Sequence, residues 1–76
     1  MNKYDALAAI VEEYEKAIQK FPPMHSPHEG LAILQEEFEE LKIEVFTNHN
    51  YRSKDKMRKE ATQVGAMALR FIVDCT

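Results

Sequence analysis

Apolar side chains recur with helical spacing in three segments of this chain. The first segment covers residues 3–20, and its apolar stripe is Leu7, Ile10, Val11, Tyr14, Ile18 and, just beyond the segment, Phe21. The second covers residues 27–46, with Leu31, Leu34, Phe38, Leu41 and Val45 on one face. The third covers residues 54–75, with Met57, Ala61, Val64, Ala68, Phe71 and Cys75 at near-heptad spacing. A period near 3.6 residues predicts helices and not strands.

Residues that interrupt helices separate the three segments. Residues 21–27 contain all three prolines, which lack a backbone N–H and push the preceding residue out of the helical region. Residues 47–53 are rich in side chains that bond their own backbone in turns. Ser26, Pro27 and Glu29 match the N-cap, first and third helical positions of a capping box. The sequence therefore predicts an all-α, three-helix chain, with helices over 3–20, 27–46 and 54–75.

A chain of this length forms one small domain. Its 76 residues would bury only about 60 % of the surface that the unfolded chain exposes. Such a core rarely supplies more than about 3–5 kcal/mol without a disulfide, a metal or a partner subunit. Cys75 is the only cysteine, so no disulfide can form within the chain. Further apolar residues widen the face of the third segment beyond what three helices need: Met67, Leu69, Ile72 and Val73. We therefore expect a helical bundle completed as a homodimer or homotetramer.

Charge and hydropathy narrow the environment in which this domain works. The first twenty residues alternate charged and apolar side chains, unlike a secretory signal, and no run of about 18 apolar residues could span a membrane. We therefore expect a cytoplasmic protein with no membrane partner. The formal net charge is −3, and the one short basic segment faces an acidic surface. This pattern argues against a nucleic-acid partner.

The second segment carries several carboxylates beside its apolar face. At about 100° per residue, Glu37 and Glu40 fall on one flank of that face and Glu36 lies further round. Like charges three or four residues apart repel by roughly a few tenths of a kcal/mol per pair. The only basic residue within 29–44 is Lys42, on the other flank. A divalent cation such as Mg²⁺ would relieve this repulsion; a solvated acidic face is the alternative.

The third segment offers a further carboxylate for the same place. Glu60 and Gln63 lie one helical turn apart, and a short loop favours antiparallel packing of the second and third helices. That packing would bring Glu60 toward Glu37 and Glu40. A carboxylate at the position of Glu60 would also stabilise the N-terminal end of its own helix, independently of any contact with the second helix. Gln63 alone would be an ordinary surface amide. Asp74 lies about 21 Å from Glu60 along the helix, too far to join one site.

A basic cluster surrounds the start of the third segment. Its members are Arg52, Lys54, Lys56, Arg58 and Lys59. Positive charge is unfavourable at a helix N-terminus, which favours an anionic partner such as a triphosphate; a solvated loop and helix start is the alternative. The chain has neither zinc-ligand spacing nor a glycine-rich phosphate loop.

The run HEGLAILQEEFEEL at residues 28–41, followed by KEATQV at residues 59–64, resembles the MazG-like all-α nucleoside triphosphate pyrophosphohydrolases. The family pattern is EExxE on one helix and ExxD on the next. The resemblance covers residues 26–74 and looks most like the short members from phages and bacterial genomes. It implies a helical bundle assembled by dimers or tetramers, in which Mg²⁺, or Mn²⁺ in its place, engages a nucleoside triphosphate. The products would be a monophosphate and pyrophosphate.

The pattern carries over to particular residues of this chain. EExxE falls on Glu36, Glu37 and Glu40, the Glu of ExxD falls on Glu60, and Gln63 stands at the Asp position. The resemblance thus implies Glu37, Glu40, Glu60 and Gln63 as metal ligands, with Glu36 as a further ligand or a base that orients water. An amide at the Asp position removes one negative charge and lowers the expected metal affinity. The third segment is still periodic at the last residue, so the family's fourth helix would lie outside this sequence or be replaced by a neighbouring subunit.

Three functions stay open at this point. The favoured one is a Mg²⁺-dependent nucleoside triphosphate pyrophosphohydrolase, with four candidates for phosphate contacts: Arg52, Lys54, Lys56 and Arg58. The second is a catalytically weak or inactive MazG-like helical module for oligomerisation or nucleotide sensing, which Gln63 supports. The third is a purely structural helical partner.

Overall fold

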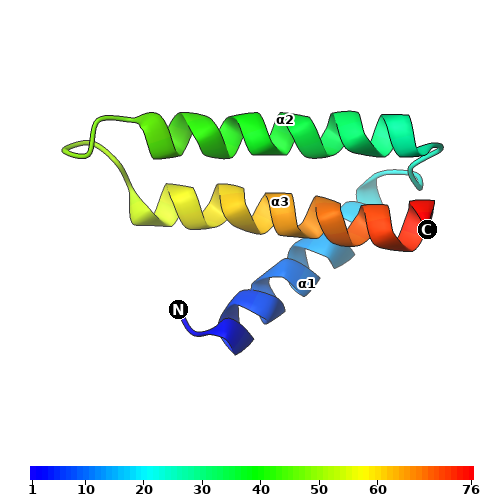
Figure 1. Cartoon of the computed structure of the whole chain (residues 1–76). Helices are drawn as coiled ribbons and strands as arrows, with labels where there is room; N and C mark the ends of the chain where they lie inside the picture. Colours follow the sequence, from blue (N-terminus) through cyan, green and yellow to red (C-terminus); the bar gives the residue numbers. More distant parts are fainter.

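The computed structural model describes residues 1–76 and contains three helices and no strands. The helices are α1 (Lys3–Lys20), α2 (Pro27–Phe46) and α3 (Lys54–Cys75) (Figure 1). The predicted all-α class and the three predicted helix ranges are confirmed. None of the three combines the length and the apolar character that crossing a bilayer requires.

Short polar side chains fix where each helix begins. The side-chain oxygens of Asn2, Ser26 and Ser53 accept hydrogen bonds from backbone N–H groups three residues on, at 2.9, 3.1 and 3.2 Å. Each bond satisfies one of the N–H groups that a helix start leaves without a partner. Only half of the expected capping box forms, because the Glu29 carboxylate accepts from the backbone N–H of His25, at 2.9 Å, and not from that of Ser26.

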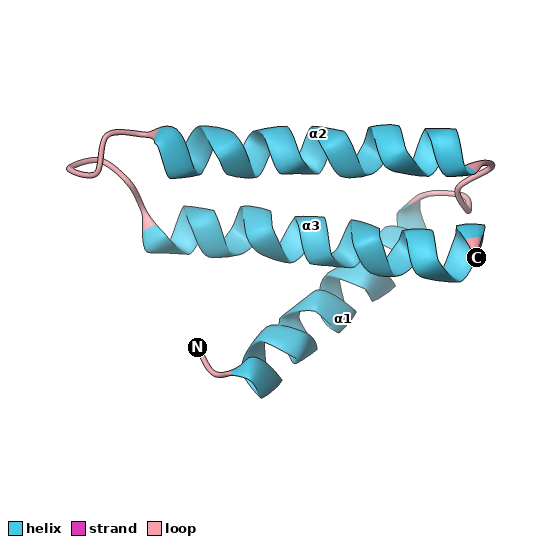
Figure 2. Cartoon of the chain, viewed as in Figure 1, coloured by secondary structure: helices cyan, strands magenta, loops and turns pink.

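Helix α3 is the centre of the fold. It runs antiparallel to α2, and α1 crosses it obliquely (Figure 1). Two short loops make the connections (Figure 2). Helices α1 and α2 both pack on α3 but not on each other. A cleft is therefore left between α1 and α2, over the part of α3 that carries Gln63, Met67 and Arg70.

The buried core is small and lies where α1, the first loop and α3 meet. Its buried apolar residues are Ala17, Met24, Ala66 and Met67, and Phe71 packs against them from a less buried position. A core of this size leaves little free energy to hold the helices, so the close approaches between helices matter.

Two glycines allow those close approaches. A Cβ atom at Gly65 of α3 would lie 2.8 Å from Ile10 Cδ1 of α1, and a Cβ atom at Gly30 of α2 would lie 2.7 Å from Phe71 Cδ2 of α3. Carbon atoms do not approach so closely without displacement. Gly65 therefore lets α1 cross α3, and Gly30 lets α2 lie against it.

The C-terminal part of α3 holds the loop that joins α1 to α2. Arg70 Nη2 donates to the carbonyl oxygen of Pro22 at 2.9 Å, and the Asp74 carboxylate accepts from the backbone N–H of Met24 at 3.0 Å. We name these two contacts the C-terminal clasp. The clasp ties the loop to α3, so it helps to set where α1 ends and where α2 begins.

The apolar stripes of α1 and α2 are covered less than the sequence pattern predicted. Leu7 of α1 is 56 % exposed, and Leu31 and Phe38 of α2 are 60 % and 53 % exposed. Gly30 and Glu37 are among the more enclosed positions of α2. The prediction that the stripe of α2 faces the core is therefore only partly right, because α2 rests on α3 alone and no further helix covers its outer side.

Candidate functional site

Three carboxylates from two helices converge beside the cleft. Glu37 and Glu40 stand one turn apart on α2, and Glu60 approaches them from α3, because the two helices run antiparallel. One carboxylate oxygen from each residue lies within 4.8 Å of the others; Glu40 is exposed, and Glu37 and Glu60 are half-buried. We name these residues the acidic triad. The approach of Glu60 to Glu37 and Glu40, which the sequence predicted, is thus present in the fold.

The triad is electrostatically strained. Partial burial is the largest cause of a raised pKa at Glu37, and the charges of Glu40, Glu60 and Glu36 add to it. Partial burial also raises the pKa of Glu60, followed by a hydrogen bond and charge repulsion from Glu40. No lysine or arginine forms an ion pair with any member of the triad. The triad is therefore a place where a cation would lower the free energy of the folded chain.

The triad also has the right chemistry for a hard divalent cation. Mg²⁺ prefers oxygen ligands and is held by one or two carboxylates together with water and substrate phosphates. The residues present fit such an ion as a donor set. Acidic groups at a similar spacing also occur on solvated helix surfaces without any ion.

The other two predicted site residues on these helices lie beside the triad. Glu36 is exposed and lines the cleft. Gln63 also lines the cleft, and its Nε2 donates to a carboxylate oxygen of Glu13 at 2.8 Å, which ties it to α1. Glu13 in turn accepts from Lys16 at 3.5 Å. Helix α1 thus orients the side chain of Gln63, through a contact that no spacing in the sequence predicts.

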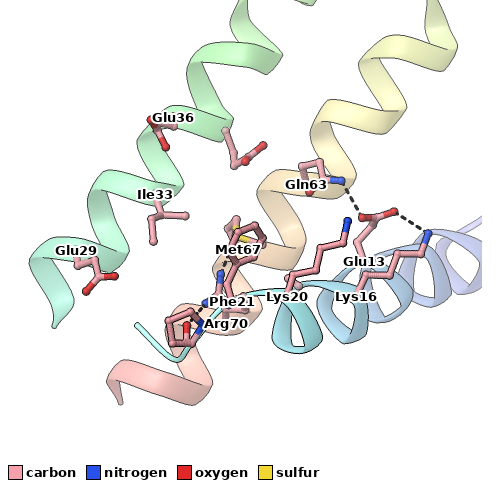
Figure 3. Close-up of a pocket in the computed structure, with 13 residues that line it drawn as sticks. Glu13, Lys16, Lys20, Phe21, Glu29, Ile33, Glu36, Gln63, Met67 and Arg70 are labelled. Atoms are coloured by element: carbon pink, nitrogen blue, oxygen red, sulfur yellow. Dashed lines mark hydrogen bonds and ion pairs between the residues drawn. The ribbon is translucent and has the colours of Figure 1, made fainter. Parts of the chain in front are cut away.

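The cleft between α1 and α2 has a volume of about 430 Å³. Figure 3 shows its walls: Glu29 and Glu36 project from α2 on one side, Lys16 and Lys20 project from α1 on the other, and α3 forms the floor. Glu37 and Gln63 also line it. Glu37 is therefore the one member of the acidic triad that lines the cleft.

The predicted basic cluster lies elsewhere. Arg52 donates to the carbonyl oxygen of Val45 at 3.4 Å, and Arg58 pairs with Asp55 at 3.4 Å. Lys54 and Lys56 are exposed and make no ion pair. None of the four lines the cleft. Their proposed contact with phosphate thus gains no support from the geometry.

Sequence reasoning missed the contribution of α1 to the cleft. Glu13, Lys16 and Lys20 carry no motif, and their position depends on the angle at which α1 crosses α3. Arg70 did carry a signal, since it is the only charged residue in the apolar run from 64 to 73. A charged side chain in such a run is rarely buried unless it has a partner.

Comparison of the chain with protein-family profiles, with curated proteins and with solved structures found no match. The resemblance to the MazG-like family therefore rests on the motif residues alone.

Proposed function

We propose that this protein is a Mg²⁺-dependent nucleoside triphosphate pyrophosphohydrolase of the MazG-like type. The observation that supports it is that the packing brings together three of the carboxylates that the motif selects. Of 13 acidic residues, the motif selects Glu36, Glu37, Glu40 and Glu60, and the last three of these converge within 4.8 Å. No other group of three His, Cys, Asp or Glu side chains in the chain converges in this way. A cytoplasmic location, where such nucleotides are abundant, fits this role.

The proposal gives the acidic residues distinct tasks. The triad would hold Mg²⁺, which when bound polarises a phosphoryl oxygen as a Lewis acid. Glu36 lies beside Glu37 on the wall of the cleft and is exposed to solvent. It would hold a water molecule in the cleft and accept its proton.

Gln63 makes the proposed site weaker than the family pattern implies. Its amide nitrogen is engaged by Glu13, which leaves its Oε1 atom as the one able to face a cation. An amide oxygen can ligate Mg²⁺ but brings no negative charge. We therefore expect Mg²⁺ affinity below that of a site with four carboxylates.

The same residue favours a second candidate function. A chain that keeps the triad but lacks the Asp could bind a nucleotide without cleaving it, as a helical module for sensing or assembly. Calorimetry with nucleotide and Mg²⁺ would separate the two candidates, because the module predicts binding with no release of pyrophosphate.

Self-association as a homodimer or homotetramer is part of the proposal. Only four apolar residues are buried in the single chain. A shallow hollow of about 320 Å³ on the outer side of α2 and α3 is lined by Leu31, Leu34, Phe38 and Val64. A second copy would remove such apolar surface from water. Light scattering that finds a stable folded monomer at micromolar concentration would contradict this part.

The enzyme proposal is tested with a nucleotide panel. We expect the purified protein to release pyrophosphate from at least one ribo- or deoxyribonucleoside triphosphate, and only with Mg²⁺ present. Glu37→Gln should abolish release. Glu39→Gln is the matched control, because Glu39 is exposed, pairs with Lys42 at 4.0 Å and lies outside the triad. No release across the whole panel at high protein concentration would refute the proposal.

A further inference from the structure

The guanidinium of Arg70 is buried without a carboxylate partner. Its side chain is 3 % exposed, yet no carboxylate lies within ion-pair distance of it. Nη2 donates to Pro22 and Nη1 to the Met67 sulfur at 3.6 Å. Nε has no partner and is the only buried side-chain nitrogen or oxygen atom in the chain of which this is true. A buried guanidinium remains charged and is costly without an anion.

A second unpaired cation lines the same cleft. Lys20 forms no ion pair, whereas Lys16 lies 3.5 Å from both Glu12 and Glu13, which neutralise much of its charge. Arg70 and Lys20 both contribute to the lining, from the floor and from the α1 side (Figure 3). The α1 and α3 sides of the cleft therefore carry net positive charge that is not compensated locally.

The opposite wall has the reverse character. Glu29, Glu36 and Glu37 line the cleft from α2, and Glu37 belongs to the acidic triad. A free anion would be repelled by this wall. An anion that carries its own divalent cation would not, because the cation could face the carboxylates while the anion faces Lys20 and Arg70.

We propose that the cleft between α1 and α2 binds a phosphoryl group together with its divalent cation, with the anion on the side of Lys20 and Arg70 and the cation on the side of Glu37, the triad member that lines the cleft. This inference rests on the proposed function and specifies how the substrate is oriented. Its phosphates lie in the cleft and not on the basic cluster around Lys54. The volume of about 430 Å³ lies within the range of roughly 300–1,000 Å³ that is common for small-molecule sites.

Inorganic pyrophosphate is the probe that tests this inference. Titration calorimetry on the full chain should detect its binding with MgCl₂ present and much weaker binding without it. Lys20→Ala should weaken binding by about tenfold or more, since it removes a charge-assisted contact, and Lys20→Arg should restore most of it. Lys54→Ala is the matched control, an exposed lysine outside the cleft, and should change affinity by less than about twofold.

The outcomes separate this inference from the proposed function. Equal affinity of wild type and Lys20→Ala, loss of binding in Lys54→Ala, or no binding of pyrophosphate to the wild type would overturn the cleft proposal. Hydrolysis that survives unchanged in Lys20→Ala would overturn it as well, while the enzyme proposal would stand. Mg²⁺-dependent binding that Lys20→Ala weakens, with no hydrolysis of any nucleotide, would support the cleft and refute the enzyme.

The Arg70 side chain provides a second readout that needs no substitution in the core. The chain has three arginines, Arg52, Arg58 and Arg70, so only three Nε–H signals are expected in a nitrogen–proton NMR spectrum. Arg52→Lys and Arg58→Lys, both at exposed positions, identify the third signal as that of Arg70. We expect Mg²⁺ and pyrophosphate together to shift the Arg70 signal. A shift confined to Arg52 or Arg58 would contradict the proposal.

Discussion

The two halves of α3 meet their neighbours through different electrostatics. In the C-terminal half, the C-terminal clasp joins Arg70 and Asp74 to backbone groups of the first loop, at 2.9 and 3.0 Å. In the N-terminal half, Glu60 faces Glu37 and Glu40, and no basic side chain pairs with any of them. At the clasp charges meet backbone groups of opposite polarity, and at the acidic triad like charges meet each other.

This difference separates what holds the chain together from what the chain can bind. Hydrogen bonds between charged side chains and backbone groups stabilise a fold. Carboxylates that are forced together destabilise it unless something is bound, and such conflicts are expected at functional sites. We therefore expect substitution of Asp74 to act on folding alone and substitutions in the triad to act through a cation. Arg70 has both roles, because it holds the first loop and also lines the cleft.

The largest effect on stability is expected at the clasp. Asp74→Ala removes the acceptor for the backbone N–H of Met24, whose residue is buried. A hydrogen bond to a charged group contributes about 1.5–3 kcal/mol, so we expect a loss of about 2 kcal/mol in the free energy of unfolding. For a domain of this size the midpoint of thermal unfolding should fall by about 8–16 °C.

Glu15→Ala is the control for Asp74→Ala. Glu15 is an exposed acidic residue of α1 that forms no ion pair, and its removal should change stability by less than about 0.5 kcal/mol. Equal losses in the two variants would show that the clasp contributes nothing specific.

The next effect is the response of the folded chain to Mg²⁺. At a free concentration ten times its dissociation constant, a ligand that binds only the folded state adds about 1.4 kcal/mol to stability. We expect the thermal midpoint to rise by about 4–8 °C for each kcal/mol gained, as measured by circular dichroism with and without MgCl₂. Asp74→Ala should keep this response at a lower midpoint, and Glu37→Gln should lose it. A response that Glu37→Gln retains would place the cation outside the triad.

Gln63→Asp tests the weak point of the proposed site. One additional negative charge about 4 Å from a divalent cation is worth about 2 kcal/mol in water, which tightens Mg²⁺ binding about 30-fold. The variant should also be less stable without Mg²⁺, because it loses the hydrogen bond to Glu13 and faces that carboxylate. Gln63→Asn has the same size without the charge. Equal Mg²⁺ affinity in the two variants would mean that residue 63 does not contact the ion.

The predictable part of this fold was encoded locally. The helix ranges follow from three caps, Asn2, Ser26 and Ser53, and from the prolines of the first loop, all of which act within a few residues. The approach of Glu60 to Glu37 and Glu40 follows from the antiparallel packing that a short loop favours. These features needed no knowledge of the packing angle between helices.

The unpredicted part depends on how helices cross. Gly65 admits Ile10 and so lets α1 lie close to α3, and this crossing brings Lys20 to the same cleft as Glu36. No spacing within one segment reports such a contact. For the same reason, helical phasing expected the apolar stripe of α2 to face inward, whereas Leu31 and Phe38 are more than half exposed.

The smallest expected effect is the dependence of stability on pH at the triad. Because the pKa values of Glu37 and Glu60 are raised in the fold above their ordinary value of 4.5, the folded chain binds protons more readily than the unfolded chain there. By linkage, the stability from these groups is fully present below the ordinary pKa and is lost as the pH rises through the raised values. In the absence of Mg²⁺, acidification from neutral pH toward that value should therefore raise this contribution.

Glu60→Gln should flatten the dependence of stability on pH and stabilise the Mg²⁺-free chain at neutral pH by roughly a few tenths of a kcal/mol. Thermal midpoints of the two proteins across this pH range measure the difference, and parallel curves would mean that the triad carboxylates do not repel one another.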